Sequence, residues 1–267
     1  MRRLHLSKAV VNAPLPNNVE FLSLSECSLW PAAFPKSRLD VATQTLTLPR
    51  LRELELLTVE LQTGAMVAVP HRVERLRIKN TILTYESYEG LDQSDVGLSA
   101  VSRMAEIDLS DSTTLTDYEV VDITTTWPHI STLKLNGCIN TTFDPSYSRD
   151  IFENLGQYGR LEVLEANGVP FSDDDIDEIC WYVGGTLRRF SVAGCPLTDH
   201  SAARIATDLI SLQSLDVSSC GQLTDRCFIV FASLRATLSF LNVSSTNVTN
   251  ATIGLLRLCM PQCQIIQ

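Results

Sequence analysis

One pattern, an apolar residue followed by apolar residues three and five positions later, recurs along this 267-residue chain. From the second copy onward, its starts are 22 to 32 residues apart. A short unit that returns at this interval cannot bury its apolar face alone, so the pattern predicts a stack of similar units. The ten copies begin at Met1, Val19, Leu51, Val73, Met104, Ile130, Leu161, Leu187, Leu212 and Leu238.

Each copy of this motif has the alternation of a short parallel strand, with apolar residues inward and the residues between them facing water. A hydroxyl residue able to cap a helix follows five of the later motifs, at Thr116, Ser172, Thr198, Thr224 and Thr249. Apolar residues at helical spacing come next, most clearly at Ile176, Ile179, Cys180 and Val183. We therefore predict strand, turn and helix in each later repeat. The acidic run 173–178 lies at such a helix start, where the helix dipole favours carboxylates.

Strand–turn–helix units at this spacing are typical of leucine-rich repeats, which span 20–29 residues. The predicted fold is an α/β leucine-rich repeat solenoid, with a curved parallel sheet on the concave face and helices on the convex face. We expect a single domain of about ten repeats over 1–267. Its repeats are irregular in 1–103 and regular in 104–267.

Four cysteines, Cys27, Cys138, Cys195 and Cys220, each stand eight positions after the start of their motif, and Leu-Thr-Asp follows the last two closely. In this the chain resembles the cysteine-containing leucine-rich repeats of the F-box family over nearly its whole length. The resemblance implies substrate recognition for cullin-type ubiquitin ligases. Two features depart from the family pattern: the repeats start too near Met1 to leave room for an F-box, and six motifs lack the cysteine. Those six carry Ala9, Val59, Thr81, Ser112, Val169 and Thr246 instead.

Composition excludes several classes of protein and partner. No stretch approaches 18 apolar residues, and the first 16 residues lack the apolar centre of a secretory signal, so we expect no membrane association. The net charge is −10, which disfavours nucleic acid, although residues 1–80 carry 11 Lys and Arg against 7 Asp and Glu. We expect a cytoplasmic protein. A mitochondrion is one alternative, because no acidic residue precedes Glu20. A cytoskeletal or ciliary assembly is the other.

No reaction chemistry is visible in the sequence. The four histidines are scattered, the eight cysteines form no C-x-x-C pair, and no nucleotide-binding or nucleophile-elbow motif occurs. We therefore predict no enzyme, no metal, no cofactor and no small-molecule ligand. The predicted function is a non-enzymatic protein–protein interaction module, either an adaptor or a structural subunit binding other protein subunits. The alternative is the substrate-recognition subunit of a cullin-type ubiquitin ligase.

The first candidate partner-binding residues, Arg75, Arg77 and Lys79, lie between the inward positions of one strand. Charges alternate in sign across neighbouring strands in the column Glu55, Arg77, Asp108, Lys134 and Glu165, and again in the column Glu53, Arg75 and Glu106. Side chains on adjacent strands can pair laterally. Two interpretations stay open: a self-neutralising polar face, or a surface that receives an acidic segment of a partner.

Two further candidates lie outside the regular rhythm. Tyr85 and Tyr88 belong to a long acidic and aromatic connection between residues 82 and 103, a composition suited to protein contact. Ile265 and Ile266 fall where an eleventh motif would begin. We expect that strand to present an uncovered edge, which another subunit or a second copy would cover.

Overall fold

The computed structural model describes residues 2–11, 15–16, 18–29, 50–61, 73–79, 104–113, 115–141 and 145–267. The chain forms two compact units, Met1–Leu115 and Thr116–Gln267.

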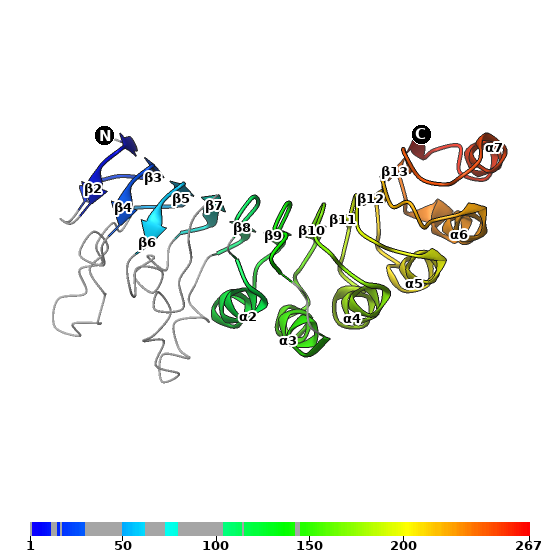
Figure 1. Ribbon diagram of the computed structural model, residues 1–267, viewed down its shortest axis with the longest axis horizontal. Coiled ribbons are helices and arrows are strands. Elements are labelled where there is room, and N and C mark those ends of the chain that lie inside the picture. Colours follow the sequence, from blue (N-terminus) through cyan, green and yellow to red (C-terminus); the bar gives the residue numbers. More distant parts are fainter. Residues whose placement is uncertain are drawn as a thin grey trace. The chain divides into compact units, whose positions relative to one another are not determined.

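The first unit is built on a parallel sheet whose strands follow chain order (Figure 1). Its strands are β1 (Arg3–Ser7), β3 (Phe21–Ser25), β5 (Glu53–Leu57), β7 (Arg75–Lys79) and β8 (Glu106–Asp108). A smaller parallel sheet accompanies it, made of β2 (Val10–Val11), β4 (Ser28–Leu29) and β6 (Glu60–Leu61). The apolar alternation thus produces parallel ladders in this unit, as the motif predicts.

The second unit alternates strands and helices, and Figure 1 shows its helices side by side along the outer side of an arc of strands. The strands, again in chain order, are β9 (Thr132–Lys134), β10 (Val163–Glu165), β11 (Arg189–Ser191), β12 (Ser214–Asp216), β13 (Phe240–Asn242) and β14 (Gln264–Ile266). The helices are α2 (Asp117–Thr126), α3 (Pro145–Gly156), α4 (Asp173–Val183), α5 (Asp199–Asp208), α6 (Asp225–Phe231), the 3₁₀ helix η5 (Ala232–Ala236) and α7 (Asn250–Cys259).

Strand register follows the motif residue by residue. In the first unit the fourth residues of successive motifs pair as Leu4, Leu22, Leu54, Leu76 and Ile107, and in the second as Leu133, Leu164, Phe190, Leu215, Leu241 and Ile265. Nearly all of these side chains are buried in the core. The predicted α/β leucine-rich repeat solenoid is confirmed, including a strand at the expected eleventh motif.

A left-handed backbone residue ends the strand segment of nine motifs, all those in which this position lies within the described residues. It stands seven positions after the motif's start and has φ between 52° and 73°. Only three of these nine positions hold glycine, the residue that adopts this conformation without steric cost. The nine are Lys8, Glu26, Thr58, Asp111, Gly137, Gly168, Gly194, Ser219 and Ser245.

The cysteine position comes next along the chain, and its side chain bonds to the preceding repeat. The Sγ of Cys195 donates to the carbonyl oxygen of Ala166 at 3.5 Å, and that of Cys220 donates to Val192 at 3.2 Å. Where a motif has serine instead, the Oγ of Ser112 donates to the carbonyl of Ile78 at 3.3 Å. A small buried donor at this position therefore satisfies a strand-end carbonyl one repeat away, which explains why cysteine and serine both occur.

The predicted helix starts are confirmed, because Thr116, Ser172, Thr198, Thr224 and Thr249 are the N-cap residues of α2, α4, α5, α6 and α7. The first residue of a helix also reaches the next repeat. Asp199 accepts hydrogen bonds from the backbone N–H of Thr224 at 2.8 Å and from its hydroxyl at 2.6 Å. Asp173 and Asp225 bond in the same way to Thr198 and Thr249. The Ser-Asp or Thr-Asp pair at each of these helix starts thus caps one helix and links it to its neighbour.

Within the described ranges, no helix is both long enough and apolar enough to cross a bilayer.

Candidate functional site

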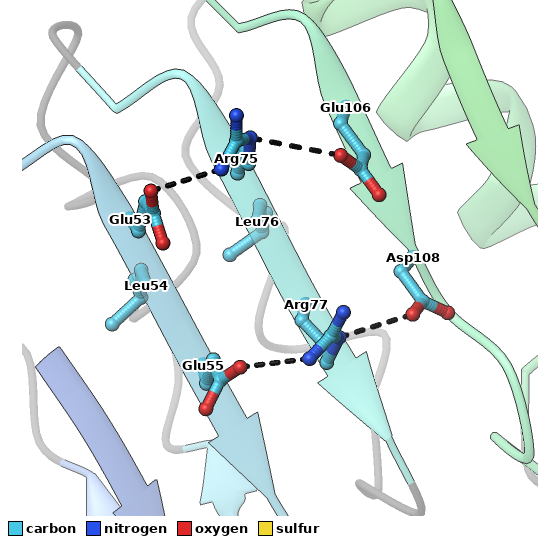
Figure 2. Close-up of a pocket in the computed structure, with 8 residues that line it drawn as sticks. All are labelled: Glu53, Leu54, Glu55, Arg75, Leu76, Arg77, Glu106 and Asp108. Atoms are coloured by element: carbon cyan, nitrogen blue, oxygen red, sulfur yellow. Dashed lines mark hydrogen bonds and ion pairs between the residues drawn. The ribbon is translucent and has the colours of Figure 1, made fainter. Parts of the chain in front are cut away.

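The charged face of the first unit's sheet brings three neighbouring strands together. Glu53 on β5 pairs in register with Arg75 on β7, which pairs with Glu106 on β8. Two residues further along the same strands, Glu55, Arg77 and Asp108 pair likewise. Because side chains two apart in a strand project from the same face, these six side chains share one surface, here named the charged ladder (Figure 2).

Each arginine of the charged ladder lies between two carboxylates. Arg75 Nη1 is 3.0 Å from Glu53 Oε1, and its Nε is 3.7 Å from Glu106 Oε2. Arg77 Nη1 is 2.8 Å from Glu55 Oε1, and its Nε is 3.1 Å from Asp108 Oδ2. Figure 2 shows both rows crossing the three strands. The lateral pairing predicted from alternating signs is confirmed for these residues.

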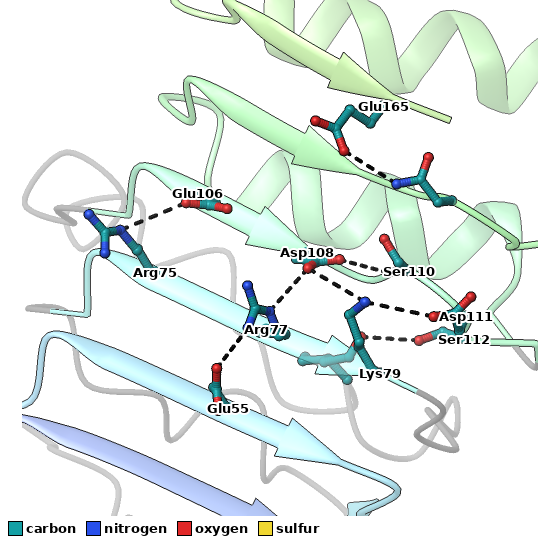
Figure 3. Close-up of polar contacts among 12 residues, drawn as sticks. Glu55, Arg75, Arg77, Lys79, Glu106, Asp108, Ser110, Asp111, Ser112 and Glu165 are labelled. Carbon is teal, nitrogen blue, oxygen red and sulfur yellow. Dashed lines mark hydrogen bonds and ion pairs between the residues drawn. The ribbon is translucent and has the colours of Figure 1, made fainter. Parts of the chain in front are cut away.

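Asp108 anchors the row, because it is only 4% exposed. Its Oδ1 accepts the backbone N–H of Ser110 at 3.1 Å, and Lys79 Nζ lies 4.0 Å from its Oδ2 (Figure 3). Burial alone would raise the pKa of Asp108, but hydrogen bonds from Ser110 and the charges of Lys79 and Arg77 outweigh it and hold that pKa below its ordinary value. Asp108 is therefore ionised at neutral pH, and it holds Arg77 in place.

The charged ladder lines a hollow of about 150 Å³, together with Leu54 and Leu76 from the same strands. Sites for small molecules typically occupy roughly 300–1,000 Å³ and are mostly apolar. The hollow is therefore too small and too polar for such a ligand.

Three buried thiols of the second unit are poorly suited to act as nucleophiles. Burial raises the pKa of Cys180 to about 12, of Cys195 to about 12 and of Cys220 to about 11, so these groups stay protonated at neutral pH. His200 Nε2 lies 3.2 Å from Asp177 Oδ2 on an exposed helix surface. In the ranges that the structure describes, no three His, Cys, Asp or Glu side chains gather as a metal site would require.

The candidate partner-binding residues predicted from sequence fall in three places. Arg75, Arg77 and Lys79 lie together on β7, where Lys79 Nζ also approaches Asp111 Oδ2 at 3.7 Å. Tyr85 and Tyr88 lie outside the described residues.

Ile265 and Ile266 lie on β14 of the second unit, where Ile266 is 38% exposed. The remaining members of the predicted charge column, Lys134 and Glu165, pair in register on β9 and β10 of this unit. Glu165 accepts a hydrogen bond from Asn136 Nδ2 at 3.4 Å (Figure 3).

A second hollow, absent from the sequence predictions, lies on the helix side of the second unit. It measures about 410 Å³ and is lined by Arg149, Asp177, Glu178, Trp181, Tyr182 and Arg204. One residue of this hollow could have been noticed in the sequence. Trp181 does not belong to the apolar face of α4, whose buried apolar residues are Ile176, Ile179, Cys180 and Val183. A tryptophan on the polar side of an amphipathic helix is a candidate contact residue.

Comparisons with known proteins identify the fold. No protein-family model matches the sequence, and no match was found among curated proteins. The Rad7 and Elc1 complex of yeast contains a chain of similar structure, with a TM-score of 0.54 and 20% identity over 94% of this chain and 69% of that one. Human 5T4, named Wnt-activated inhibitory factor 1 or trophoblast glycoprotein, gives a TM-score of 0.49 and 15% identity over 95% of this chain and 79% of its own.

Proposed function

We propose that this chain is a protein–protein interaction module, an adaptor or a structural subunit of a larger assembly, and that it catalyses no reaction. The observation that carries the proposal is the charged ladder, an open sheet face whose side chains are held in fixed positions by one another. Fixed polar groups lower the conformational entropy lost on binding. With a net charge of −10, the expected partners are other proteins and not nucleic acid or membrane.

The arrangement of charges defines what a partner on this face must offer. The side chain of Arg75 is 62% exposed and that of Arg77 is 43% exposed. A guanidinium has five N–H donors, so each arginine can bind its two carboxylates and still donate to a partner. Carboxylates lie on β5 and β8, on either side. The matching partner therefore carries an acidic or carbonyl group over β7 and donors over the two flanking strands.

The test compares two partly exposed arginines of the first unit. Arg77→Ala removes a central member of the charged ladder, whereas Arg52→Ala removes an arginine outside it, whose Nη1 lies 3.3 Å from Glu74 Oε1. Proteins bound to the full chain would be identified by cross-linking and mass spectrometry. We expect Arg77→Ala to lose partners that the wild type and Arg52→Ala retain. An unchanged set of partners in a folded Arg77→Ala variant would contradict the use of this face.

A second candidate function is substrate recognition in a cullin-type ubiquitin ligase. It is favoured by the cysteine position, where Cys195 and Cys220 bond to the preceding repeat, and by the resemblance to F-box-family repeats that this position carries. The structural likeness to a chain of the Rad7 and Elc1 complex is compatible with it. Co-purification of cullin components with the full chain would support this function, and their absence from an otherwise intact set of partners would oppose it.

The other predicted contact residues extend the same proposal. The acidic connection bearing Tyr85 and Tyr88 and the edge strand bearing Ile265 and Ile266 are further places for subunit contact. Cross-links from these two segments to another chain are the expected result.

A further inference from the structure

Trp181 is a largely exposed tryptophan on a helix of the second unit. It lies on α4 and is 76% exposed, while Ile176, Ile179 and Val183 of the same helix are fully buried. Figure 1 shows α4 between α3 and α5. Exposing an indole to water sacrifices a large part of the free energy that burial of so large an apolar surface would contribute. The core of the fold does not use this residue, so its exposure points to a role at the surface.

The hollow around Trp181 is bounded by a polar group from each neighbouring helix. On the α3 side, the Nε of Arg149 lies 3.3 Å from the hydroxyl of Tyr182 and 3.9 Å from Glu153 Oε2. On the α5 side, Arg204 Nε is 2.8 Å from Asp177 Oδ1. Its Nη2 is 2.7 Å from Asp208 Oδ2. Both arginines are therefore already neutralised by carboxylates of the same surface.

Acidic residues dominate these three helices. They carry nine carboxylates, two in α3, five in α4 and two in α5, against two arginines. Glu178 lines the hollow and lies three residues before Trp181, so the two project from the same side of α4. The exposed face of the indole ring is electron-rich, and cations bind to such faces. Arg149 also interacts electrostatically with Glu178. Carboxylates still outnumber arginines on these helices, so an indole beside Glu178 is an arrangement that attracts a cationic side chain.

We propose that the hollow around Trp181 binds a basic segment of a protein partner, with a lysine or arginine side chain over the indole and Glu178 as its counter-charge. This inference rests on the proposed function as an interaction module, and it deepens that function by naming the partner's chemistry and a second surface. A second copy of this chain in a two-fold contact would bring the same acidic face to the hollow, and the like charges would repel. An acidic segment is disfavoured for the same reason.

The test uses a fluorescently labelled octapeptide of alternating lysine and arginine, titrated with the full chain and followed by fluorescence anisotropy. We expect saturable binding that Trp181→Ala weakens by about tenfold or more, since a central tryptophan dominates such contacts. Trp181→Phe should weaken binding less, because it keeps an aromatic face. Glu178→Gln should also weaken it, whereas the matched control Glu162→Gln, on the loop before β10, should leave it unchanged. Thermal unfolding would establish that every variant is folded.

Three results of the peptide titration would overturn the inference: no saturable binding of the basic octapeptide, equal binding by folded Trp181→Ala, or tighter binding of an octaglutamate peptide. A concentration-dependent self-association that Trp181→Ala abolishes would assign the hollow to a second copy and would also overturn it. The proposed function fails by a different measurement. If the wild-type chain cross-links to no protein at all, the interaction module is refuted; if it does, but the peptide does not bind, only the Trp181 inference falls.

Discussion

Asp173→Ala should destabilise the second unit far more than its surface position suggests. Asp173 begins α4 and accepts the backbone N–H of Thr198 at 3.1 Å and its hydroxyl at 2.6 Å. It also accepts the hydroxyl of Ser201 in the next helix. These bonds join two consecutive repeats at the N-termini of their helices. Removing the carboxylate leaves the buried hydroxyl of Ser201 without this acceptor.

The magnitude follows from the bonds that are lost. A hydrogen bond to a charged group contributes roughly 1.5–3 kcal/mol, but the three share one carboxylate and are not additive. We therefore expect the free energy of unfolding to fall by about 2–4 kcal/mol, a large share of the roughly 5–15 kcal/mol typical of folded proteins. Urea denaturation followed by circular dichroism measures this difference directly.

Asp174→Ala is the matched control. Asp174 is the next residue in the same helical turn and is exposed, so its substitution removes the same charge from the same end of the helix dipole. That effect is worth roughly 0.3–1 kcal/mol. Equal losses in the two variants would refute the reasoning, because they would show that the dipole and not the bonds between repeats accounts for the effect.

The pH dependence gives an independent check. Burial would raise the pKa of Asp173, but hydrogen bonds from Ser201 and Thr198 outweigh it and hold that pKa below its ordinary value. A carboxyl whose pKa is lowered in the folded state stabilises fully above its unfolded pKa of about 3.9, and this contribution is lost as the pH falls through the folded value. The stability gap between the wild type and Asp173→Ala should therefore shrink below pH 4. A gap that stayed constant or widened there would contradict the assignment.

Three further predictions concern the repeats. Leu215→Asp should unfold the second unit, because Leu215 is fully buried at the centre of β12 and burying an unpaired carboxylate costs several kcal/mol. A melting temperature like that of the wild type would show that Leu215 does not point into the core. Arg77→Glu should lower stability by about 0.2–1 kcal/mol for the pair with the partly exposed Glu55, and by more for the pair with the buried Asp108, as measured by urea denaturation. A loss of partner binding with no loss of stability would favour the docking interpretation over the self-neutralising one. Gly194→Ala should lower the free energy of unfolding by about 1 kcal/mol. A Cβ at Gly194 would meet no atom within 4 Å, so the whole cost comes from the left-handed backbone, with φ at 73°. Ser219→Gly should relieve the same strain, and we expect opposite shifts in the two melting temperatures.

The sequence by itself determined the repeat architecture. Leu164, Phe190 and Leu215 align from the residue pattern alone, because alternate apolar residues define the inward face of a strand and their recurrence defines the stack. Helix starts such as Thr198 and Thr224 are equally predictable. N-capping depends on a hydroxyl residue and the few residues after it, all of them local in the chain.

Features joining residues of different repeats needed the tertiary structure. Asp173 reads in the sequence as a favourable charge at a helix start, yet it bonds to Thr198, 25 residues away. Lys8 and Thr58 give no sign of a left-handed backbone, since only the glycines at the equivalent positions would suggest one. The hydrogen bond of Asp173 and the backbone conformation of Lys8 and Thr58 depend on the distance and rotation between stacked repeats. A local sequence pattern does not specify that geometry.

The charged ladder and the hollow around Trp181 show the same division. Alternating signs on neighbouring strands predict that Arg77 pairs with Glu55. Residues in register on adjacent strands lie side by side, because the strands are about 4.8 Å apart. The hollow around Trp181 is not predictable in this way, although the residue's place outside the apolar spacing is visible. Trp181 lies beside polar groups of two other helices because of the way in which those helices pack against α4. Only the tertiary structure shows that packing.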